Sequence, residues 1–570
     1  MTTHPVGIDL GTTISAIARL DEAGRTVMVP NAEGGTLTPS VVLFDDSGII
    51  VGREALKLAA QAAGRIARWV KRDMGSPAYS QPIGGQFLPP EAIQACILGQ
   101  LRADIERHLG TSYAPVITVP AFFDEPRRRA TAEAAAMAGV PLLDIVNEPT
   151  AAALAFGEQL GYLDASYLNS GGGGEPLKLL VYDLGGGTFD VTIVDLRPGQ
   201  IRALATDGDS MLGGYDWDRR LADFAAEEFL RAHGIDPRQD PLGFHDLMLA
   251  AEQAKLALSA RMTAIIRVVH GGKSLDVPMT RDSFEERTSD LLYRTSMTSR
   301  QVAAAAGLKW SDIDRVLLVG GSSRMPAARK MLLDLTGREP HGEVNPDEAV
   351  ARGAAIYAGH LLRQRHGAAR PAAGAAPPQP VAVAAGRPLE VTNVSAHSLG
   401  IEGFNVNVGR RCNTVLIPRN SPLPARVTRK FVTRKIGQQS IVVQVLEGES
   451  SRIEDCTRVG RLVIRNLPPG LPAGSPIKVT YEYGANGRVN ITAQISGSNA
   501  AIQLELQRSG ERSTGQINAW RQVLASEPKL EQLTPIVLAE LASPAPTNIH
   551  ISDTDISLPE DDMSPPRSGK

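Results

Sequence analysis

Two segments of the chain, about 170 residues apart, share one sequence pattern, in which an apolar strand carries an aspartate into a glycine-containing turn. This repetition constrains the fold more than any other feature. The first, VGIDLGTTIS at 6–15, is an apolar strand that carries Asp9 into a tight turn. The second, LLVYDLGGGTFDVTIVD at 179–195, brings Asp183 to a glycine turn at the same offset and continues into another strand. A tight hairpin turn with no ligand could account for either segment taken alone. The acidic residue at the same offset in both predicts duplicated halves that hold one ligand from opposite sides.

The composition of the two turns favours phosphate as the bound group. The first turn supplies Gly11, Thr12 and Thr13, and the second supplies Gly185, Gly186, Gly187 and Thr188. Small residues followed by hydroxyl side chains let backbone N–H groups and side-chain oxygens close around phosphate oxygens. The carboxylates of Asp9 and Asp183 can hold a hydrated Mg²⁺ ion beside them. We therefore predict a nucleotide between the two turns.

The size and charge of the chain exclude several classes of protein. With 570 residues, 43% of them hydrophobic and 21% charged, the chain is too long for a single core, so two or three domains are expected. Its 59 Lys and Arg nearly balance 62 Asp and Glu, so net charge does not attract it to nucleic acid or to a membrane surface. No run of 18 apolar residues and no basic, apolar leader occurs, so we expect a cytoplasmic protein.

The order of apolar runs predicts an α/β domain followed by a linker. From residue 5 to about 360, strand-like runs alternate with Ala-rich helical stretches, a pattern that indicates α/β layers. We expect this first domain to span residues 1–366. Residues 367–393 begin with a segment rich in Ala, Pro and Gly, which is typical of a linker.

The remainder of the chain has a different pattern. Over residues 394–507, short β-rich runs are separated by Pro and Gly turns and indicate an antiparallel β domain. Residues 508–570 are expected to hold one short helix near 516–525 and then an acidic, Pro-rich disordered tail. We expect no long helical region after the β domain.

Six motifs, in order along the chain, carry a resemblance to a known family. They are GIDLGTT at 7–13, VITVPAFF at 116–123, NEPTAAALAFG at 147–157, YDLGGGTFD at 182–190, LVGGSSRMP at 318–326 and NPDEAVARGAA at 345–355. With these motifs the chain resembles the DnaK-type, seventy-kilodalton heat-shock chaperones over residues 5–360, and more loosely to about 505. The wider actin and sugar-kinase superfamily usually shares only the two phosphate hairpins and a third glycine turn, so the match is specific.

The resemblance implies an α/β actin-like ATPase domain, with two lobes built from ribonuclease-H-like halves, followed by an antiparallel β sandwich. It implies slow hydrolysis of ATP to ADP and phosphate, with Mg²⁺ and K⁺ as the ions. Lys71, in WVKRDMG, matches the lysine that positions the attacking water and neutralises developing phosphate charge. Glu148 would lie near the magnesium and the water, Asp9 and Asp183 would hold Mg²⁺ through water, and Thr188 would complete the catalytic group.

The resemblance also implies which residues bind the nucleotide. The turn residues named above would bind the β- and γ-phosphates from two sides. In AEQAKLALS, Glu252, Lys255 and Ser259 would meet the ribose and base, on one helix face because positions i, i+3 and i+7 align. The remaining members of the implied nucleotide site are Gly213, Gly214, Gly320, Gly321, Ser322, Arg324 and Asp347.

After the linker, SLGIEGFN and QSIVVQVLEGE resemble strands of the family's peptide-binding β sandwich. The peptide groove would carry over to Ile401, Phe404, Phe431 and Val442, whose strands would bind an extended chain by backbone hydrogen bonds and an apolar pocket. Ordinary core positions of a sandwich are the alternative for each of them. The implied partners are unfolded or extended polypeptides, a J-domain co-chaperone and a nucleotide exchange factor.

Three departures from the family pattern concern coupling and client binding. The interdomain segment LEVTN, at 389–393, has Asn393 where the family has an aspartate, so the sequence leaves open whether the two domains are coupled. Asp144 replaces an arginine that J-domain proteins often use, so it also leaves open whether a J-domain protein stimulates hydrolysis. The part after the β domain is too short for the family's helical lid, which predicts weak client binding with fast release. Five basic residues in RVTRKFVTRK, at 426–435, suggest a preference for acidic or phosphorylated clients, although such runs are ordinarily solvated strand faces.

Three functions remain open from the sequence. The first is an ATP-dependent chaperone in which slow hydrolysis switches the affinity of the β domain for extended apolar segments. The second is a chaperone-like regulator or exchange factor that binds ATP stably and uses the β domain as a fixed interaction surface. The third, a small-molecule kinase on the same actin-like core, is disfavoured by the sandwich and by the lack of a sugar-site motif.

Overall fold

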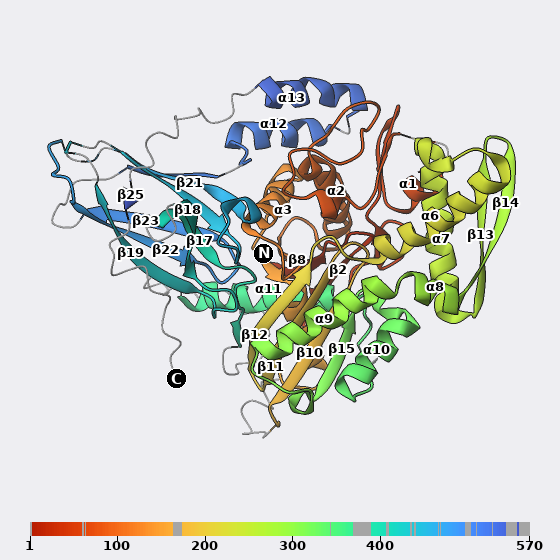
Figure 1. Cartoon of the computed structure of the whole chain (residues 1–570), viewed down its shortest axis with the longest axis horizontal. Coiled ribbons are helices and arrows are strands. Elements are labelled where there is room, and N and C mark those ends of the chain that lie inside the picture. The colour runs from red at the N-terminus through yellow and green to blue at the C-terminus, as the bar shows by residue number, and fades with distance from the viewer. Residues whose placement is uncertain are drawn as a thin grey trace. The chain divides into compact units, whose positions relative to one another are not determined.

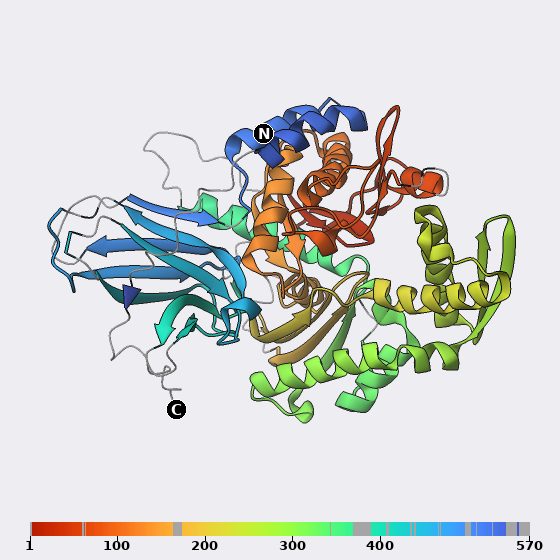
Figure 2. The same ribbon diagram turned by 45° about the horizontal axis from the view of Figure 1, so that its top comes forward.

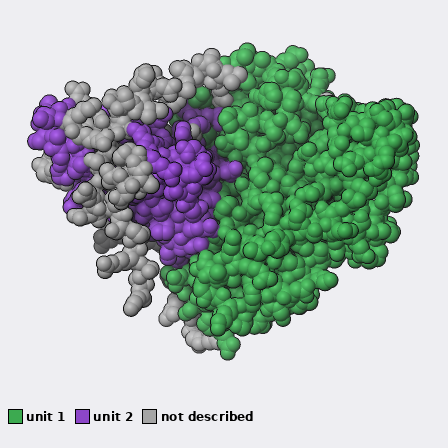
Figure 3. All heavy atoms as spheres, viewed as in Figure 1, with its two compact units in different colours: residues 1–123, 131–391, 514–538 green, residues 124–130, 392–513, 539–570 purple. Residues whose placement is uncertain are grey.

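The computed structural model describes residues 3–557, apart from 60–61, 63, 164–173, 342–343, 369–388, 406–409, 434–435, 438–439, 466, 468, 496–502, 509, 527 and 543–555. The chain forms two compact units (Figure 3). Unit 1 comprises residues 1–123, 131–391 and 514–538, and unit 2 comprises residues 124–130, 392–513 and 539–570. The sequence does not predict that a segment near the C-terminus belongs to the first unit.

One mixed sheet of unit 1 is built around the first glycine turn. Its strands are β1 (His4–Asp9), β2 (Ile14–Leu20), β3 (Thr26–Met28), β4 (Leu37–Pro39), β8 (Tyr113–Val119) and β9 (Asp144–Asn147). The order is β3-β2-β1-β8-β9, with β4 also paired to β2. Strand β1 runs antiparallel to β2 and parallel to β8. Every residue of β8 is buried, as expected for a central strand covered on both faces.

A second mixed sheet of unit 1 repeats this pattern around the second turn. Its strands are β10 (Leu177–Leu184), β11 (Phe189–Arg197), β12 (Gln200–Asp209), β15 (Arg315–Val319) and β16 (Glu390–Thr392), in the order β15-β10-β11-β12-β16. Strand β10 runs antiparallel to β11 and parallel to β15. Each sheet therefore has an antiparallel hairpin whose first strand pairs in parallel with a strand from much later in the chain.

Ten α-helices and two further, small sheets are described in the part of the chain before residue 369. The helices are α1 (Arg53–Leu58), α2 (Pro90–Leu109), α3 (Glu125–Met137), α4 (Glu148–Gln159), α6 (Gly214–His233), α7 (Pro241–Ala260), α8 (Arg281–Arg287), α9 (Ser289–Ala305), α10 (Pro326–Thr336) and α11 (Ala349–Ala368). The first residues of α3 group with unit 2. The small sheets are β6-β5-β7, from β5 (Val42–Asp45), β6 (Gly48–Val51) and β7 (Ile66–Ala67), and β13-β14, from β13 (Thr263–His270) and β14 (Lys273–Thr280). Figure 1 shows the β13–β14 hairpin beside α6 and α7.

Helix α11, which packs on the first mixed sheet, and helix α4, which packs mainly on the second, approach each other very closely. A Cβ atom on Gly353 of α11 would overlap the carbonyl oxygen of Ala151 in α4. Both helices are rich in buried alanine, which together with Gly353 permits this approach. Their side chains share one hydrophobic core with residues of both mixed sheets, including Val116 and Val181. The NEPTAAAL and ARGAA motifs therefore supply the packing that supports the two hairpins.

The end of the expected linker is ordered in unit 1. Most of the Ala, Pro and Gly segment, residues 369–388, lies outside the described residues. Beyond it, Leu389 is buried and Val391 packs against the same core as α4 and α11. The backbone N–H of Glu390 donates a hydrogen bond of 2.9 Å to the carbonyl of Gly199. LEVTN thus adds an edge strand, β16, to the second mixed sheet.

Unit 2 is a β sandwich made of two antiparallel sheets. One sheet is β18-β17-β20-β21-β24, from β17 (Leu399–Asn405), β18 (Arg410–Ile417), β20 (Ile441–Glu447), β21 (Thr457–Arg465) and β24 (Gln503–Arg508). The other is β23-β22-β19-β25, from β19 (Ala425–Thr433), β22 (Pro476–Tyr483), β23 (Val489–Ile495) and β25 (Ile556–Ser557). Residues of both sheets form one hydrophobic core. Asn393, in the place of the family aspartate, is buried in this unit, and its backbone carbonyl accepts a hydrogen bond from Leu423 N at 2.8 Å.

Two helices follow the sandwich in the sequence, α12 (Thr514–Leu524) and α13 (Leu530–Ala542). The predicted helix near 516–525 corresponds to α12, whereas α13 was not predicted. Both views show the two helices side by side (Figures 1 and 2). Residues 514–538 belong to unit 1, where Trp520 is fully buried and Gln86 Nε2 donates a hydrogen bond of 2.8 Å to Thr534 Oγ1. The expected tail beyond them lies mainly outside the described residues.

Among the helices of the described ranges, none combines the length and the apolar character that crossing a bilayer requires.

Candidate functional site

The two glycine turns of unit 1 face one small cavity. Its volume is about 100 Å³. Thirteen of the residues singled out in the sequence line it, namely Asp9, Gly11, Thr12, Thr13, Lys71, Glu148, Asp183, Gly185, Gly186, Thr188, Gly320, Gly321 and Asp347. They come from positions 9 to 347 of the chain, so the fold brings together residues that the sequence separates widely. The apolar lining residues Ile14, Val319, Pro346 and Val350 were not singled out.

The two turns touch each other across the cavity. A Cβ atom on Gly186 would lie 2.5 Å from Thr13 Cγ2, and one on Gly187 would lie 2.5 Å from Thr12 Cγ2. Any side chain at either glycine would therefore collide with the opposite turn. The cavity is smaller than the roughly 300–1,000 Å³ of typical ligand pockets. The cavity therefore accounts for only part of the predicted nucleotide site, because the helix residues predicted to bind the ribose and base do not line it.

Lys71 and Glu148 form a buried ion pair at the wall of the cavity. Lys71 lies in a short 3₁₀ helix, Val70–Asp73, and Glu148 begins α4. The Nζ atom of Lys71 donates to Glu148 Oε1 at 2.5 Å, and the two side chains are only 5% and 9% exposed. Removing one partner of such a buried pair typically costs about 3–5 kcal/mol. The pair therefore holds both charged groups in fixed positions beside the phosphate turns.

The carboxylates of the cavity are under mutual repulsion. Burial raises the pKa of Asp9 to about 7, and the charge of Glu148 adds to this shift while Lys71 opposes it. Burial also raises the pKa of Asp183 well above its usual value, followed by the charges of Glu148 and Asp190. The cavity thus holds more carboxylate than the ammonium group of Lys71 neutralises. A bound divalent cation would remove this repulsion.

The residues present fit a magnesium ion held through water. Carboxylate oxygens are ligands that Mg²⁺ prefers, and Mg²⁺ usually keeps several of its waters when it binds protein. Asp9 and Asp183 approach the cavity from the two opposite hairpins. In the described part of the chain, no group of three His, Cys, Asp or Glu side chains is arranged to chelate an ion directly.

Two further residues lie beside these carboxylates and were not assigned to the site from the sequence. Thr118, in VITVPAFF, donates a hydrogen bond of 3.1 Å from Oγ1 to Asp9 Oδ1. Asp190 lies opposite Asp183 in the hairpin register and accepts a hydrogen bond of 2.8 Å from the backbone N–H of Phe122. Both residues lie inside motifs that carry the family resemblance. Their position in those motifs was the available signal, and only the register shows what they contact.

Several residues predicted to bind adenosine gather beside the second turn without lining the small cavity. A Cβ atom on Gly213 would lie 2.5 Å from the backbone of Gly187, and one on Gly214 would lie 2.8 Å from Lys255 Nζ and closer still to Ser322 Oγ. Lys255 donates to the carbonyl of Gly214 at 3.1 Å and pairs with Asp218 at 2.8 Å. Burial raises the pKa of Asp218 to about 6, and the charge of Lys255 opposes that shift.

The other predicted adenosine residues have protein partners in this structure. Glu252 pairs with Arg68 at 2.9 Å, and Ser259 Oγ donates to the carbonyl of Lys255 at 3.2 Å. Arg324 pairs with Asp347 at 2.7 Å, which connects it to the wall of the phosphate cavity. A nucleotide would therefore have to compete with, or join, existing ion pairs at Glu252 and Arg324.

The predicted peptide groove has a different character. Ile401 and Phe431 are 1% and 0% exposed and belong to the hydrophobic core of the sandwich. Val442 is half-buried on β20. Phe404 lies on β17, but its side chain is outside the described residues. In this conformation, therefore, Ile401 and Phe431 are not available to a ligand.

The basic run at 426–435 is divided between two faces of β19. Arg426 and Lys430 are exposed on one face, and Arg429 is half-buried on the other face, which also carries Phe431. Lys430 lies opposite Lys478 of β22 in the register, so two like charges adjoin on the outer face. Arg434 and Lys435 lie outside the described residues. The described basic side chains of this run therefore do not all lie on one face of the strand.

Two glycine hairpins that face one carboxylate-lined cavity are typical of proteins that hold nucleotide phosphates between two similar sheets. A comparison with protein families gives the more specific identity. The family model described as Hsp70 protein matches residues 5–83 and 77–534. The chain therefore belongs to the Hsp70 family. Family membership implies an actin-like ATPase domain followed by a β sandwich, and members are ATP-dependent chaperones that bind ATP or ADP with Mg²⁺.

Proposed function

We propose that this chain is an ATP-dependent chaperone in which slow ATP hydrolysis in unit 1 switches the affinity of the β sandwich for extended apolar polypeptide segments. The observation that carries the proposal is the cavity between the two glycine turns, with the Lys71–Glu148 pair and two carboxylates of raised pKa in its wall. In this proposal the two mixed sheets form the centres of the two lobes of an actin-like ATPase domain. Opening and closing of the gap between their turns admits and releases nucleotide.

Hydrolysis requires a positioned water and stabilisation of charge on the γ-phosphate. A water oxygen attacks the γ-phosphorus, the bond to the bridging oxygen of ADP breaks, and phosphate and a proton are released. Lys71 would face the charge that develops on the γ-phosphoryl oxygens, and Glu148 would orient the water. Backbone N–H groups of the two turns, with Thr12, Thr13 and Thr188, would bind the remaining phosphate oxygens.

Asp9 and Asp183 would hold a hydrated Mg²⁺, which neutralises phosphate charge when it is bound. Thr118 keeps the Asp9 carboxylate in one orientation through its hydrogen bond. The K⁺ suggested by the family resemblance has no support in the residues described.

A stable-binding regulator is a second candidate, and one observation favours it. Ile401 and Phe431, two residues of the expected groove, are in the core of the sandwich. A sandwich of this kind could present a fixed surface to a partner in place of a groove that nucleotide controls. Turnover of ATP, and its response to peptide, distinguishes this candidate from the chaperone.

The decisive experiment is single-turnover ATP hydrolysis by the full chain, with and without an extended apolar peptide. The chaperone proposal expects hydrolysis that needs Lys71 and accelerates with peptide. Tight ATP binding without turnover would support the regulator. The same assay with a J-domain protein tests Asp144 and Asn393, because full stimulation would show that these substitutions are harmless.

A further inference from the structure

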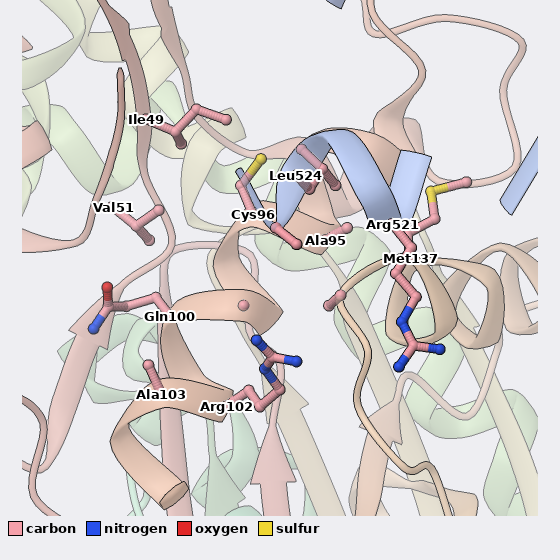
Figure 4. Close-up of a pocket in the computed structure, with 13 residues that line it drawn as sticks. Ile49, Val51, Ala95, Cys96, Gln100, Arg102, Ala103, Met137, Arg521 and Leu524 are labelled. Atoms are coloured by element: carbon pink, nitrogen blue, oxygen red, sulfur yellow. The ribbon is translucent and has the colours of Figure 1, made fainter. Parts of the chain in front are cut away.

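A second cavity lies in unit 1, and it shares no lining residue with the phosphate cavity. Its volume is about 260 Å³. Figure 4 shows that its walls come from β6, α2, the end of α3 and α12. The cavity exists only because α12, from near the C-terminus, packs on unit 1.

Most of the wall is apolar. Ile49 and Val51 line it from β6, and Leu524 lines it from α12 (Figure 4). On α2, Cys96, Gly99 and Ala103 face it, which fits the i, i+3 and i+7 positions of one helix face. Burial raises the pKa of the Cys96 thiol to about 12, so this side chain contributes a neutral surface.

Two arginines converge at one side of this apolar space. Arg102 comes from α2 and Arg521 from α12, and both line the cavity (Figure 4). A Cβ atom on Gly139 would lie 2.8 Å from Arg102 Nη1 and 3.3 Å from Arg521 Nε, so the two guanidinium groups are neighbours. Two adjacent positive charges repel each other unless an anion lies between them.

The charges of these arginines are poorly matched by the protein. The Nε atom of Arg102 is buried without a hydrogen-bond partner, and the nearest carboxylate oxygen, on Glu106, lies 3.8 Å away. In the described residues, the side chain of Arg521 forms neither an ion pair nor a hydrogen bond. An arginine whose guanidinium group lacks protein partners can bind a carboxylate or phosphate group through its planar N–H donors.

We propose that this cavity binds a small amphipathic anion, with an apolar body against Ile49, Val51 and Leu524 and a carboxylate or phosphate group between Arg102 and Arg521. The volume is slightly below the roughly 300–1,000 Å³ of typical ligand pockets, which suits a compact ligand. Because α12 supplies one wall, the ligand binds only while α12 lies on unit 1. By linkage, it stabilises that position of α12. The proposal is independent of ATP turnover.

Calorimetric titration of the full chain tests the site with octanoate and with related probes of known structure. Octanoate combines an apolar body with a carboxylate, octanol keeps the body without the charge, and acetate keeps the charge without the body. We expect octanoate to bind at least tenfold more tightly than either of the others. Octyl phosphate tests whether the head group can be phosphate. Binding of octanol equal to that of octanoate would overturn the role of the arginines.

Variants of the lining residues locate the binding. Arg521→Gln should weaken octanoate at least tenfold and leave octanol unchanged, whereas Arg25→Gln, at an arginine that is 79% exposed, should change neither. No heavy atom lies within 4 Å of a Cβ placed on Gly99, so Gly99→Leu should fill the cavity and abolish binding of both probes. Gly99→Ala controls for the effect of removing a helical glycine, because its methyl group fills little of the space.

Hydrogen exchange gives a second readout that does not depend on the heat of binding. Octanoate should slow exchange of the amides in α12, and the slowing should disappear in Gly99→Leu. Failure of octanoate to bind at millimolar concentration would overturn the proposal. So would unchanged binding by Gly99→Leu, because that result would place the ligand elsewhere, for example on the sandwich.

Discussion

The cavity between the two glycine turns of unit 1 was predicted from its own motifs as well as from the family resemblance, whereas the groove of unit 2 was predicted from the resemblance alone. The structure places the residues of these two predicted sites in different surroundings. In unit 1, thirteen of the predicted residues line one cavity. In unit 2, Ile401 and Phe431 are fully buried in the core. The difference lies in residue type. A buried lysine, aspartate or glycine turn has few structural reasons to be where it is, whereas a buried isoleucine or phenylalanine is what any sandwich core requires.

The largest effect expected from this comparison concerns Lys71. Lys71→Ala should lower single-turnover ATP hydrolysis by about 10²–10³, because in the proposed mechanism the charge developing on the γ-phosphate loses one of its cationic partners. The variant also leaves Glu148 unpaired in a buried site, so its thermal unfolding and its ATP affinity should be measured in parallel. A matched control is Lys57→Ala, because Lys57 is exposed on α1. If Lys71→Ala hydrolyses ATP at the wild-type rate, Lys71 has no catalytic role, and the residues at this cavity of unit 1 are no better assigned to function than those of the expected groove in unit 2.

Phe431 tests the other side of the comparison. Phe431→Ala should lower the free energy of unfolding of unit 2 by about 3–5 kcal/mol, because it leaves a large void in the core. Val442→Ala, at a half-buried position, should cost about 1 kcal/mol. Urea denaturation followed by far-UV circular dichroism measures both. If Phe431→Ala instead weakens peptide binding while stability is unchanged, Phe431 is a groove residue and the comparison fails.

One buried group in each unit, Glu447 in unit 2 and His245 in unit 1, should change stability with pH in opposite directions. Burial raises the pKa of Glu447 in unit 2 to about 8, and the charge of Asp124 adds to the shift, while a hydrogen bond from the Tyr483 hydroxyl opposes it. A carboxyl group with a raised pKa stabilises the fold fully below its unfolded pKa, and this contribution is lost as the pH rises through 8. Unit 2 should therefore lose a few kcal/mol between about pH 5 and 9.

Thermal unfolding across this pH range measures the loss. Glu447→Gln should flatten the dependence, and Glu482→Gln, at an exposed position of β22, should leave it unchanged. An equally steep dependence in Glu447→Gln would assign the titration to another group.

A smaller effect of opposite sign is expected from His245 in unit 1. Burial lowers the pKa of His245 to about 4, followed by the charge of Arg68, and its Nε2 atom has no hydrogen-bond partner. A base with a lowered pKa stabilises the fold above its unfolded pKa, and this contribution is lost as the pH falls from about 6.5 through 4. Chemical denaturation at pH 7 and pH 5 should show the loss in the wild type and a smaller loss in His245→Leu. Equal losses in both proteins would contradict this assignment.

The structure brings most residues of the two predicted turns to one cavity, and the sequence could indicate this because they lie in motifs with little conformational freedom. The second turn must keep Gly186 and Gly187 where it meets the two threonines of the first turn. Asp9 and Asp183 hold corresponding places in two similar hairpins. The sequence could not show what each adenosine residue contacts. The i, i+3 and i+7 rule placed Glu252 and Lys255 on one helix face, but only the fold brings Arg68 to the first and Asp218 to the second.

Helix α13 shows where local reasoning fails. Pro535 lies inside the helix, where proline removes a hydrogen bond and costs about 3 kcal/mol, so the sequence argues against a helix there. Packing on unit 1 outweighs this cost. Leu533 and Val537 are buried, and Leu530 packs against Gly84. These contacts join residues more than 400 positions apart, so no local pattern could have revealed them.

Residues 514–538 belong to unit 1 although they follow the sandwich strands of 392–513 in the sequence, and this fixes the order in which parts of the chain can pack during synthesis. A nascent chain emerges from its N-terminus, and domains generally fold as they emerge. Here most of the sandwich, at 392–513, must leave the ribosome before the last helices of unit 1 can pack. Until then the surface that receives Trp520 and Leu533 stays uncovered, so the newly made chain passes through a stage in which it exposes apolar surface of its own.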